Sequence, residues 1–273
     1  MAVIAVARQI SALGDKVSSL AAEALGYKFV DKRMIEERLW DAGLTKDILD
    51  KYDEKKPGFI ASMTKNRDLY FHYLKTAVLT EAAEGNIIII GRGAFAILGG
   101  IPGVFSVRFV SSMETRVKRT MEDFECGEKE AQQIVTKSDN DRSGFHNSFF
   151  NVDWEDPVHY HLVLNTDLLS PESSAGIIES AVEKAVSAED VQKGDAVIKQ
   201  RLLAQKIVNC ILFEEGIQVH FLDAVVEGQV LLLHGVTSSV AGVERSLEIA
   251  RRMAPGYEVK SSIAVVQDFK AYP

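Results

Sequence analysis

The feature that most constrains the fold is residues 2–26, where an apolar run is followed by a polar loop and an amphipathic helix. The run VIAVA, residues 3–7, has the length and unbroken apolar character of a strand buried on both faces of a parallel sheet. A loop between such a strand and the next helix commonly binds phosphate, because its amides and the helix dipole point toward one place. The segment therefore predicts an α/β fold with an anion site above the first strand.

The loop, residues 8–16 (RQISALGDK), stands where a phosphate loop would stand but differs from the usual motif. The motif G-x-x-x-x-G-K-[ST] uses glycines to bring amides close to the phosphates, a lysine for the terminal phosphates and a hydroxyl for Mg²⁺. This chain keeps Gly14, and Asp15 adds a negative charge beside the site. The residues that we predict to bind the nucleotide phosphates are Arg8, Ser11, Gly14, Lys16 and Ser18.

Composition narrows the class of protein. With 273 residues, 47% of them hydrophobic and 26% charged, the chain has an ordinary globular composition and is long enough for two domains. Its formal charge of −8 argues against a nucleic-acid partner, while a small enclosed basic pocket is compatible with it. The cysteines and histidines lack the spacing of a metal site, so we predict no metal site of the protein's own.

The amino terminus and the apolar runs predict the location of the protein in the cell. The amino terminus has no basic signal-like region, and no apolar run approaches the length that spans a membrane. The sequence therefore predicts a cytoplasmic protein without a membrane span.

Strands alternate with helices over the first 186 residues. The run IIII, residues 87–90, is typical of a fully covered central strand. Further strands are predicted at 27–30, 104–110 and 158–165, and helices at 33–40, 67–84, 113–123, 128–137, 139–149 and 171–186. This alternation predicts a doubly wound parallel sheet, and the polar residues 41–57 are predicted to form a surface insertion that covers the site.

The carboxy-terminal part follows a different pattern. A polar stretch, residues 187–195, precedes a predicted helix at 196–213, a hairpin of strands 217–227 and 229–236, a helix at 240–253 and a strand at 257–267. We therefore predict two domains, residues 1–188 and 195–273, of which the second is a small α+β domain with the order α-β-β-α-β.

Four arginines are the candidate catalytic residues, because phosphoryl transfer requires cations around the transferred group. They are Arg92, Arg116, Arg119 and Arg142. Arg92 lies between two glycines at the end of the central strand, where ligands of α/β proteins bind. The alternatives are a salt bridge at the strand end for Arg92, a solvated helix face for Arg116 and Arg119, and a structural ion pair for Arg142.

The predicted substrate-binding residues lie at the same sheet edge. They are Asp31, Arg33 and Arg92. Asp31 either accepts a hydrogen bond from a substrate hydroxyl or caps the helix that follows it, and on sequence alone capping is the commoner role of an aspartate at this position.

Several of these segments together resemble one known family. They are Arg8-Gln9, 27–32 (YKFVDK), 90–93 (IGRG), the helix with Arg116 and Arg119, 137–142 (KSDNDR), 152–154 (VDW) and 165–167 (NTD). In this order they resemble the cytidylate-kinase-like proteins, a branch of the nucleoside-monophosphate kinases with the P-loop fold. A placement without gaps puts Gly14 at the position of the phosphate lysine and Lys16 at that of the hydroxyl.

This resemblance carries implications for fold and activity. It implies a five-stranded parallel sheet with a mobile lid, and ATP with Mg²⁺ as the phosphate donor. It also implies that Arg92 binds the phosphate of CMP or a similar acceptor, and that Arg116, Arg119 and Arg142 close over the transferred group.

Residues 195–273 resemble the BON domain, a small module thought to bind phospholipid or other partners. The resemblance is carried by 230–236 (VLLLHGV), by the helix with Ala250 and by the last strand. It implies a lipid or protein partner for this part of the chain.

Three functions remain open on the sequence. The first is a kinase that moves the terminal phosphate of ATP onto CMP or a similar acceptor. The second is a pseudokinase that binds a nucleotide or another small anion and signals through the BON-like domain. The third is an interaction module in which both domains bind protein or lipid.

Overall fold

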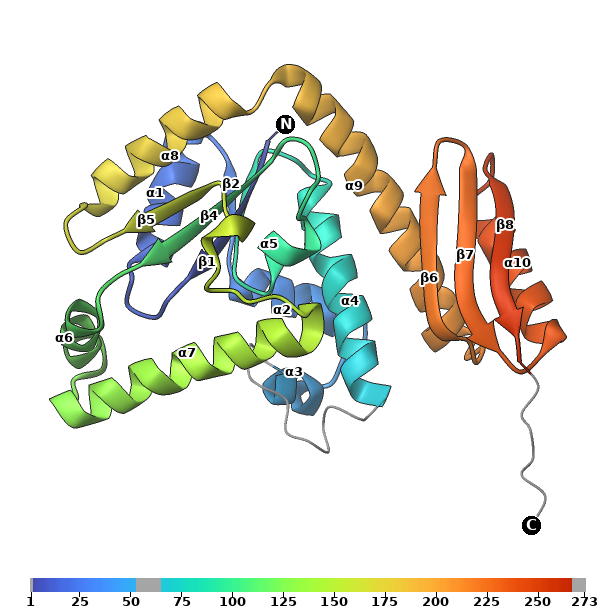
Figure 1. The fold of residues 1–273 in the computed structure, drawn as a ribbon, viewed down its shortest axis with the longest axis horizontal. Helices are drawn as coiled ribbons and strands as arrows, with labels where there is room; N and C mark the ends of the chain where they lie inside the picture. Colours follow the sequence, from blue (N-terminus) through green and yellow to red (C-terminus); the bar gives the residue numbers. More distant parts are fainter. Residues whose placement is uncertain (1, 53–64, 267–273) are drawn as a thin grey trace, which may run out of the picture. The chain divides into compact units, whose positions relative to one another are not determined.

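The computed structural model describes residues 2–52 and 65–266 (Figure 1). The chain divides into two compact units, Met1–Ala196 and Val197–Pro273. The division falls within the helix α9 (Ala188–Asn209), which begins before the start that we predicted at residue 196. The physical reason is a cap: the Ser187 hydroxyl accepts the Asp190 amide at 3.1 Å and donates to the Asp190 carboxylate at 2.5 Å.

The first unit is built on a five-stranded sheet with the order β2-β3-β1-β4-β5. The strands are β1 (Val3–Arg8), β2 (Lys28–Val30), β3 (Ile87–Ile90), β4 (Val104–Val110) and β5 (Leu162–Asn165). Every neighbouring pair is parallel, which confirms the predicted parallel sheet. The strands β1 and β3 pair from Val3 with Ile87 to Val6 with Ile90, so their carboxyl ends meet at one edge.

Helices flank this sheet. They are α1 (Gly14–Leu25), α2 (Lys32–Asp41), α3 (Lys46–Tyr52), α4 (Lys65–Ala82), α5 (Ala94–Ile97), α6 (Met113–Phe124), α7 (Glu128–Phe150) and α8 (Pro171–Ala185). The predicted insertion 41–57 contributes α3, and its residues 53–57 lie outside the described residues.

Two local predictions were wrong. The stretch 128–150 is one helix rather than two, since it contains no proline and its Ser138 accepts a hydrogen bond from the Arg142 guanidinium one turn later. The last strand of the sheet begins at Leu162 rather than at Val158, because Pro157–His159 form a 3-10 turn. The Asp156 carboxylate accepts the Val158 amide at 2.9 Å and fixes this turn.

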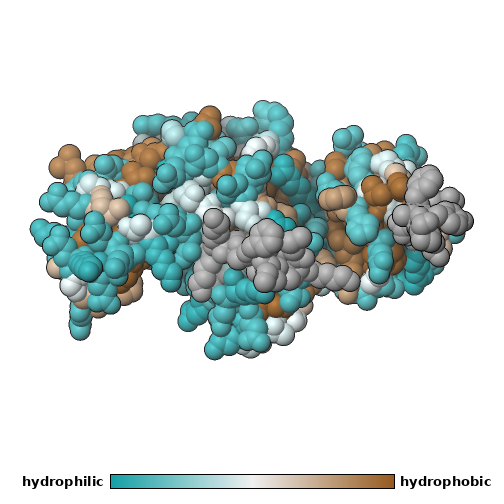
Figure 2. Space-filling model, turned by 60° about the horizontal axis from the view of Figure 1, so that its bottom comes forward, coloured by the Kyte–Doolittle hydropathy of each residue, from teal (hydrophilic) through white to brown (hydrophobic). Residues whose placement is uncertain are grey.

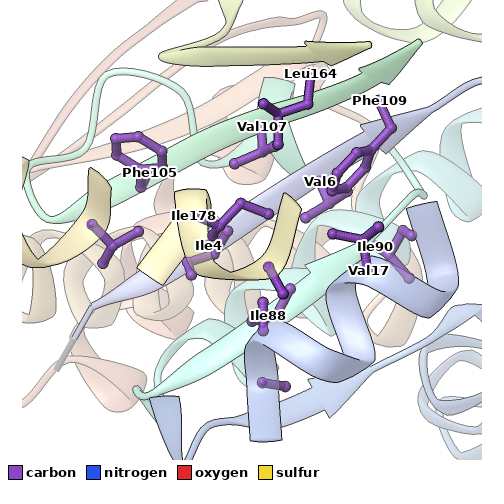
Figure 3. Close-up of a cluster of buried hydrophobic side chains, with 14 of the residues drawn as sticks. Ile4, Val6, Val17, Ile88, Ile90, Phe105, Val107, Phe109, Leu164 and Ile178 are labelled. Atoms are coloured by element: carbon purple, nitrogen blue, oxygen red, sulfur yellow. The ribbon is translucent and has the colours of Figure 1, made fainter. Parts of the chain in front are cut away.

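The core of the first unit lies between the sheet and two helices, α1 and α8. Ile4, Val6 and Ile88 from the strands pack with Val17 of α1 and Ile178 of α8 (Figure 3). These side chains are almost fully buried. On the other side, α4 contacts β3 and α5 contacts β1. Both faces of the sheet are thus covered, as its continuous apolar strands require.

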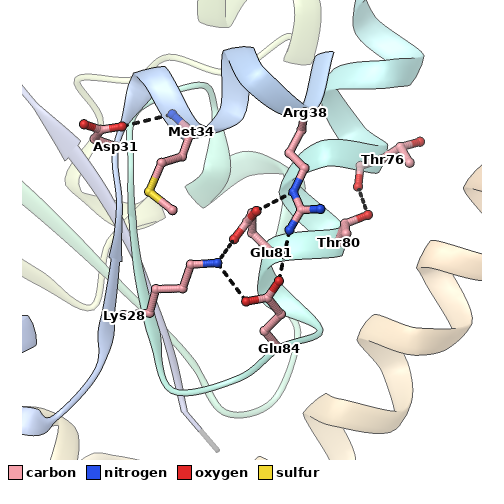
Figure 4. A network of polar contacts seen from close by, with 8 residues as sticks. All are labelled: Lys28, Asp31, Met34, Arg38, Thr76, Thr80, Glu81 and Glu84. Atoms are coloured by element: carbon pink, nitrogen blue, oxygen red, sulfur yellow. Dashed lines mark hydrogen bonds and ion pairs between the residues drawn. The ribbon is translucent and has the colours of Figure 1, made fainter. Parts of the chain in front are cut away.

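An ionic network around the buried carboxylate of Glu81 joins β2, α2 and α4 (Figure 4). The carboxylate of Glu81, 1% exposed, accepts hydrogen bonds from Lys28 and Arg38, both at 2.7 Å. Glu84 binds the same two cations at 2.8 and 3.0 Å, and the hydrogen bond from Lys28 lowers the pKa of its carboxyl. The network fixes α2, the helix that carries Asp31 and Glu36 to the carboxyl edge of the sheet.

The second unit has its own core and sheet. After α9 and a π-helical turn, Cys210–Glu214, come β6 (His220–Glu227), β7 (Val230–Thr237), α10 (Val240–Met253) and β8 (Glu258–Val265). The strand β7 pairs antiparallel with β6 and parallel with β8. The element order matches the predicted α-β-β-α-β, and Gln267, the predicted end of the last strand, lies outside the described residues.

Hydrophilic side chains cover most of the face in Figure 2, and hydrophobic ones are scattered among them. Exposed apolar residues such as Trp40, Leu168 and Phe221 come from different elements. Over the described part of the chain, no helix combines the length and the hydropathy that a membrane span requires.

Candidate functional site

The carboxyl edge of the five-stranded sheet holds three residues with unusual backbone conformations. Ser11, Leu13 and Arg92 have φ angles of 55°, 57° and 54°, in the left-handed region that favours glycine. Such a conformation costs roughly 1–2 kcal/mol for a residue with a side chain. Residues of this kind gather at functional sites, where the surrounding structure holds them in place. The carboxyl edge of the sheet is therefore the candidate binding site.

A pocket of about 280 Å³ lies beside the loop after β1, and we call it the loop pocket. Five predicted residues line it: Arg8, Ser11, Gly14, Lys16 and Arg142. The other lining residues are Gln9, Ile10, Leu13, Asp15, Asp123 and Phe124. Three cationic side chains and two carboxylates line the pocket, so its lining carries a net positive charge.

The loop keeps its shape through contacts outside the pocket. The Arg119 guanidinium donates to the Ser11 carbonyl at 3.2 Å and to the Thr166 carbonyl at 2.7 Å. The Thr166 hydroxyl donates to the Ala12 carbonyl at 3.2 Å, and the hydroxyls of Ser11 and Thr120 lie 2.8 Å apart. Arg119 therefore positions the loop and does not line the pocket.

Gly14 is required by the packing of Arg8. A Cβ atom at Gly14 would lie 2.7 Å from the Arg8 Cβ atom and 3.1 Å from the Phe109 ring. The Arg8 guanidinium in turn lies 3.6 Å from the Asp15 carboxylate. A lysine at position 14 would consequently displace Arg8, so the arginine and the usual phosphate lysine exclude each other here.

Arg92 forms the second part of the site, the Arg92 corner, with Glu36, Tyr70, Gly93 and Phe150. The Arg92 side chain is 1% exposed and donates to the Glu36 carboxylate at 2.5 Å and to the Tyr70 hydroxyl at 3.5 Å. The sequence prediction missed Glu36. The available signal was its place one turn after Asp31 and Lys32, on a helix that starts at this edge.

Aromatic rings from the end of α7 close the Arg92 corner. A Cβ atom at Gly93 would lie 2.4 Å from the Phe150 ring. The Phe150 ring also packs on Phe71 at 5.5 Å between centroids. The cavity that remains beside Gly91, Gly93 and Arg142 is about 10 Å³. A volume of this size holds about one water molecule at most, but Arg92, Glu36, Tyr70 and Phe150 do not line it. The Arg92 corner is closed because the Arg92 side chain is buried and the Phe150 ring packs against Gly93.

The structure also locates the other predicted arginines and Ser18. Both carboxylate oxygens of Asp139 accept Arg116 at 2.9 Å, which ties α6 to α7. Arg33 is 79% exposed and lies 3.9 Å from Glu37. Ser18 is buried in α1, is not among the residues that line the loop pocket, and its hydroxyl has no hydrogen-bond partner among the described residues.

Asp31 and Asp167 stabilise the edge through backbone contacts. The Asp31 carboxylate accepts the Met34 amide at 3.0 Å and caps α2. The Asp167 carboxylate accepts the Ser111 hydroxyl and the Ser112 amide, the latter at 3.0 Å. The hydrogen bond from Ser111 is the main reason that the pKa of Asp167 is lowered to about 2. The loops after β4 and β5 are therefore fixed to each other.

Comparison with known proteins identifies the family. The model of the cytidylate kinase-like family matches residues 3–168. The chain belongs to this family. None of the curated proteins matches it.

Solved structures resemble the cytidylate-kinase-like unit in fold. One is an uncharacterized protein from Eubacterium ventriosum ATCC 27560, with 23% identity and a TM-score of 0.54 over 67% of this chain and 98% of that one. Another is shikimate kinase from Bacteroides thetaiotaomicron, with 18% identity and a TM-score of 0.42 over 67% and 98%. A third is a gluconokinase from Sinorhizobium meliloti 1021, with 15% identity and a TM-score of 0.42 over 70% and 95%.

The loop pocket fits phosphate better than it fits Mg²⁺. Arg8, Lys16 and Arg142 are suitable partners for phosphate oxygens. The hydroxyl that usually binds Mg²⁺ is replaced by Lys16, and Asp15 is engaged by Arg8. No group of three or more metal-binding side chains occurs in residues 2–52 and 65–266. We therefore assign no step to the metal.

Proposed function

We propose that the cytidylate-kinase-like unit binds the phosphates of ATP in the loop pocket and transfers the terminal phosphate to CMP or a similar acceptor at Arg92. The observation that carries this proposal is the position of Arg8 and Arg142. Both line the loop pocket and also the small cavity beside Gly91 and Gly93. They thus lie beside both the loop and the glycines that flank Arg92, and we expect a transferred phosphate to pass there.

The charges around this path suit phosphoryl transfer. Catalysis of this reaction depends mostly on positioning and on neutralising negative charge, and no general base is required. Arg8 occupies the space that a phosphate lysine would need, and it supplies a cation from the end of β1 instead. Arg142 adds a second cation from α7, which also carries the rings that cover the Arg92 corner.

A second candidate function is nucleotide binding without transfer. Two observations favour it: Arg92 is buried, and it already binds a carboxylate. A pseudokinase of this kind would signal its occupancy to the carboxy-terminal unit. For that unit we keep the BON-like assignment, with a lipid or protein partner, as a proposal supported by its α-β-β-α-β order.

A coupled assay and a thermal shift on the intact chain separate these functions. We expect ATP with Mg²⁺ to raise the melting temperature, since a ligand stabilises the folded form that binds it. Arg142→Gln should lower the rate of transfer to CMP at least about 100-fold, as removal of one charge-stabilising donor does. The control is Lys184→Gln, a change at an exposed lysine of α8 that does not line the pocket, which should leave the rate unchanged.

Each outcome decides between the candidates. A thermal shift without turnover by the unchanged chain favours the pseudokinase. Turnover that Arg142→Gln does not slow contradicts the proposed path of the phosphate. If neither ATP nor CMP changes the melting temperature, both nucleotide functions are wrong.

A further inference from the structure

Glu36 is a charged residue of the Arg92 corner to which the proposed reaction assigns no role. Its carboxylate lies 2.5 Å from the Arg92 guanidinium. The two side chains come from α2 and from the turn after β3, 56 residues apart in sequence. A hydrogen bond between two charged groups in a closed site is strong. An acceptor that binds the Nη2 group of Arg92 must therefore displace Glu36.

Glu36 has a second cation within reach. The ammonium group of Lys32, one helical turn earlier, lies 3.6 Å from the Glu36 carboxylate. The Glu36 side chain is 30% exposed, whereas that of Arg92 is 1% exposed. The carboxylate can thus leave Arg92 and keep Lys32 and water as partners, while the arginine cannot reach solvent. Of the two side chains, only Glu36 can therefore exchange its partner for Lys32 and water.

We propose that Glu36 determines the specificity of the acceptor site by competing for Arg92, with Lys32 holding the displaced carboxylate. This inference rests on the proposed function. A phosphate monoester carries a charge of about −1.5 to −2 near pH 7 and offers three strong acceptor oxygens. A carboxylate or a hydroxyl offers Arg92 no more than Glu36 already does. The acceptor class that Glu36 admits is therefore a phosphate monoester, while neutral polyols and carboxylates are excluded.

Binding of CMP and of inorganic phosphate to the intact chain tests this role by isothermal titration calorimetry. Glu36→Gln removes the competing charge and keeps the size of the side chain. We expect it to bind both ligands at least about tenfold more tightly, because a hydrogen bond between charged groups no longer has to be broken. The matched control is Glu37→Gln on the same helix, whose carboxylate lies 3.9 Å from the exposed Arg33.

A second variant has the opposite expected sign. Lys32→Met removes the partner of the displaced carboxylate, so CMP should bind at least about threefold more weakly. A purely structural role of Glu36 would weaken binding in both variants. Should Glu36→Gln fail to fold, Glu36→Ala takes its place with the same expected gain in affinity, and unchanged or weaker binding of phosphate by Glu36→Ala overturns the inference.

The remaining outcomes are also decisive. Unchanged or weaker binding of phosphate by folded Glu36→Gln overturns the inference, as does an equal gain in Glu37→Gln. Absence of ATP binding together with tighter phosphate binding in Glu36→Gln refutes the proposed function alone. ATP binding with no response to Glu36→Gln refutes the inference alone.

Discussion

The loop pocket and the Arg92 corner lie at the same sheet edge but differ in what they keep of a kinase site. The loop has lost the usual lysine and most glycines, and yet it borders a hollow of about 280 Å³. The Arg92 corner keeps its arginine and both flanking glycines, and yet the arginine is buried and the Phe150 ring packs against Gly93. A site can therefore lose its motif residues and stay open, or keep them and be closed.

The difference has a physical cause in each part. In the loop pocket, Arg119 and Thr166 hold the loop by its carbonyl oxygens, so the loop keeps its shape without glycine at positions 11 and 13. In the Arg92 corner, a carboxylate neutralises the arginine and Phe150 packs against Gly93. The first arrangement leaves space for an anion, and the second requires a rearrangement before an anion can enter.

The largest expected effect is at Gly93. Gly93→Ala adds a methyl group 2.4 Å from the Phe150 ring at a φ of 68°, so we expect a loss of about 3 kcal/mol in the free energy of unfolding. The control is Gly100→Ala, where φ is 71° and nothing lies within 4 Å, with an expected loss of about 1 kcal/mol. Urea denaturation measures both. Equal losses would mean that the Arg92 corner is not tightly packed.

The corresponding test of packing in the loop pocket is a substitution of Gly14. Gly14→Ala should lower the free energy of unfolding by about 2 kcal/mol, because the Arg8 side chain must move from its position 2.7 Å away. ATP binding should weaken in the same variant. Gly127→Ala, with nothing within 4 Å of the added methyl, serves as the control. A stable Gly14→Ala protein with normal ATP affinity would separate Arg8 from the phosphate site.

A pH effect is expected from His72 on α4, whose ring contacts Phe71 beside the Arg92 corner. Burial lowers the pKa of His72 to about 3, so the folded chain keeps it neutral, while the unfolded chain binds a proton below about pH 6.5. Stability is thus complete above pH 6.5 and falls as the pH drops toward 3. We expect a loss of about 1–2 kcal/mol between pH 7 and pH 5.

Urea denaturation at several pH values measures this slope. His72→Gln should flatten it between pH 7 and pH 5. An unchanged slope in His72→Gln would show that His72 is accessible to protons in the folded chain.

The smallest expected effect is at Arg33. Arg33→Ala removes an exposed side chain 3.9 Å from Glu37 and should change the free energy of unfolding by less than about 0.5 kcal/mol. The affinity for CMP should also stay the same. A clear loss of affinity would bring Arg33 back to the substrate-binding role that the sequence predicts.

Local patterns were sufficient for much of the fold. The apolar runs 87–90 and 104–110 coincide with β3 and β4, and the predicted helix 171–186 starts at the same residue as α8. Arginine between glycines at the end of β3 was also visible. These features depend on residues that are neighbours in the sequence, so periodicity and capping rules detect them.

Contacts between distant segments could not be predicted in the same way. The carboxylate that accepts a hydrogen bond from Arg92 comes from α2. The side chain that leaves no room for a Cβ atom at Gly14 is that of Arg8, at the end of β1. Arg119 lies on the predicted helix, but its guanidinium donates a hydrogen bond to the carbonyl of Ser11. Each of these contacts depends on how the strands and helices pack, which a single sequence does not specify.

The central claim is that the loop pocket still binds the phosphates of a nucleotide, and titration calorimetry of ATP with Mg²⁺ into the intact chain tests it most directly. We predict one ATP bound per chain, an affinity at least about fivefold lower in Lys16→Ala, and no change in Lys184→Ala, a lysine of α8 that does not line the pocket. Absence of ATP binding by the unchanged chain, or equal affinities in all three proteins, would contradict the claim.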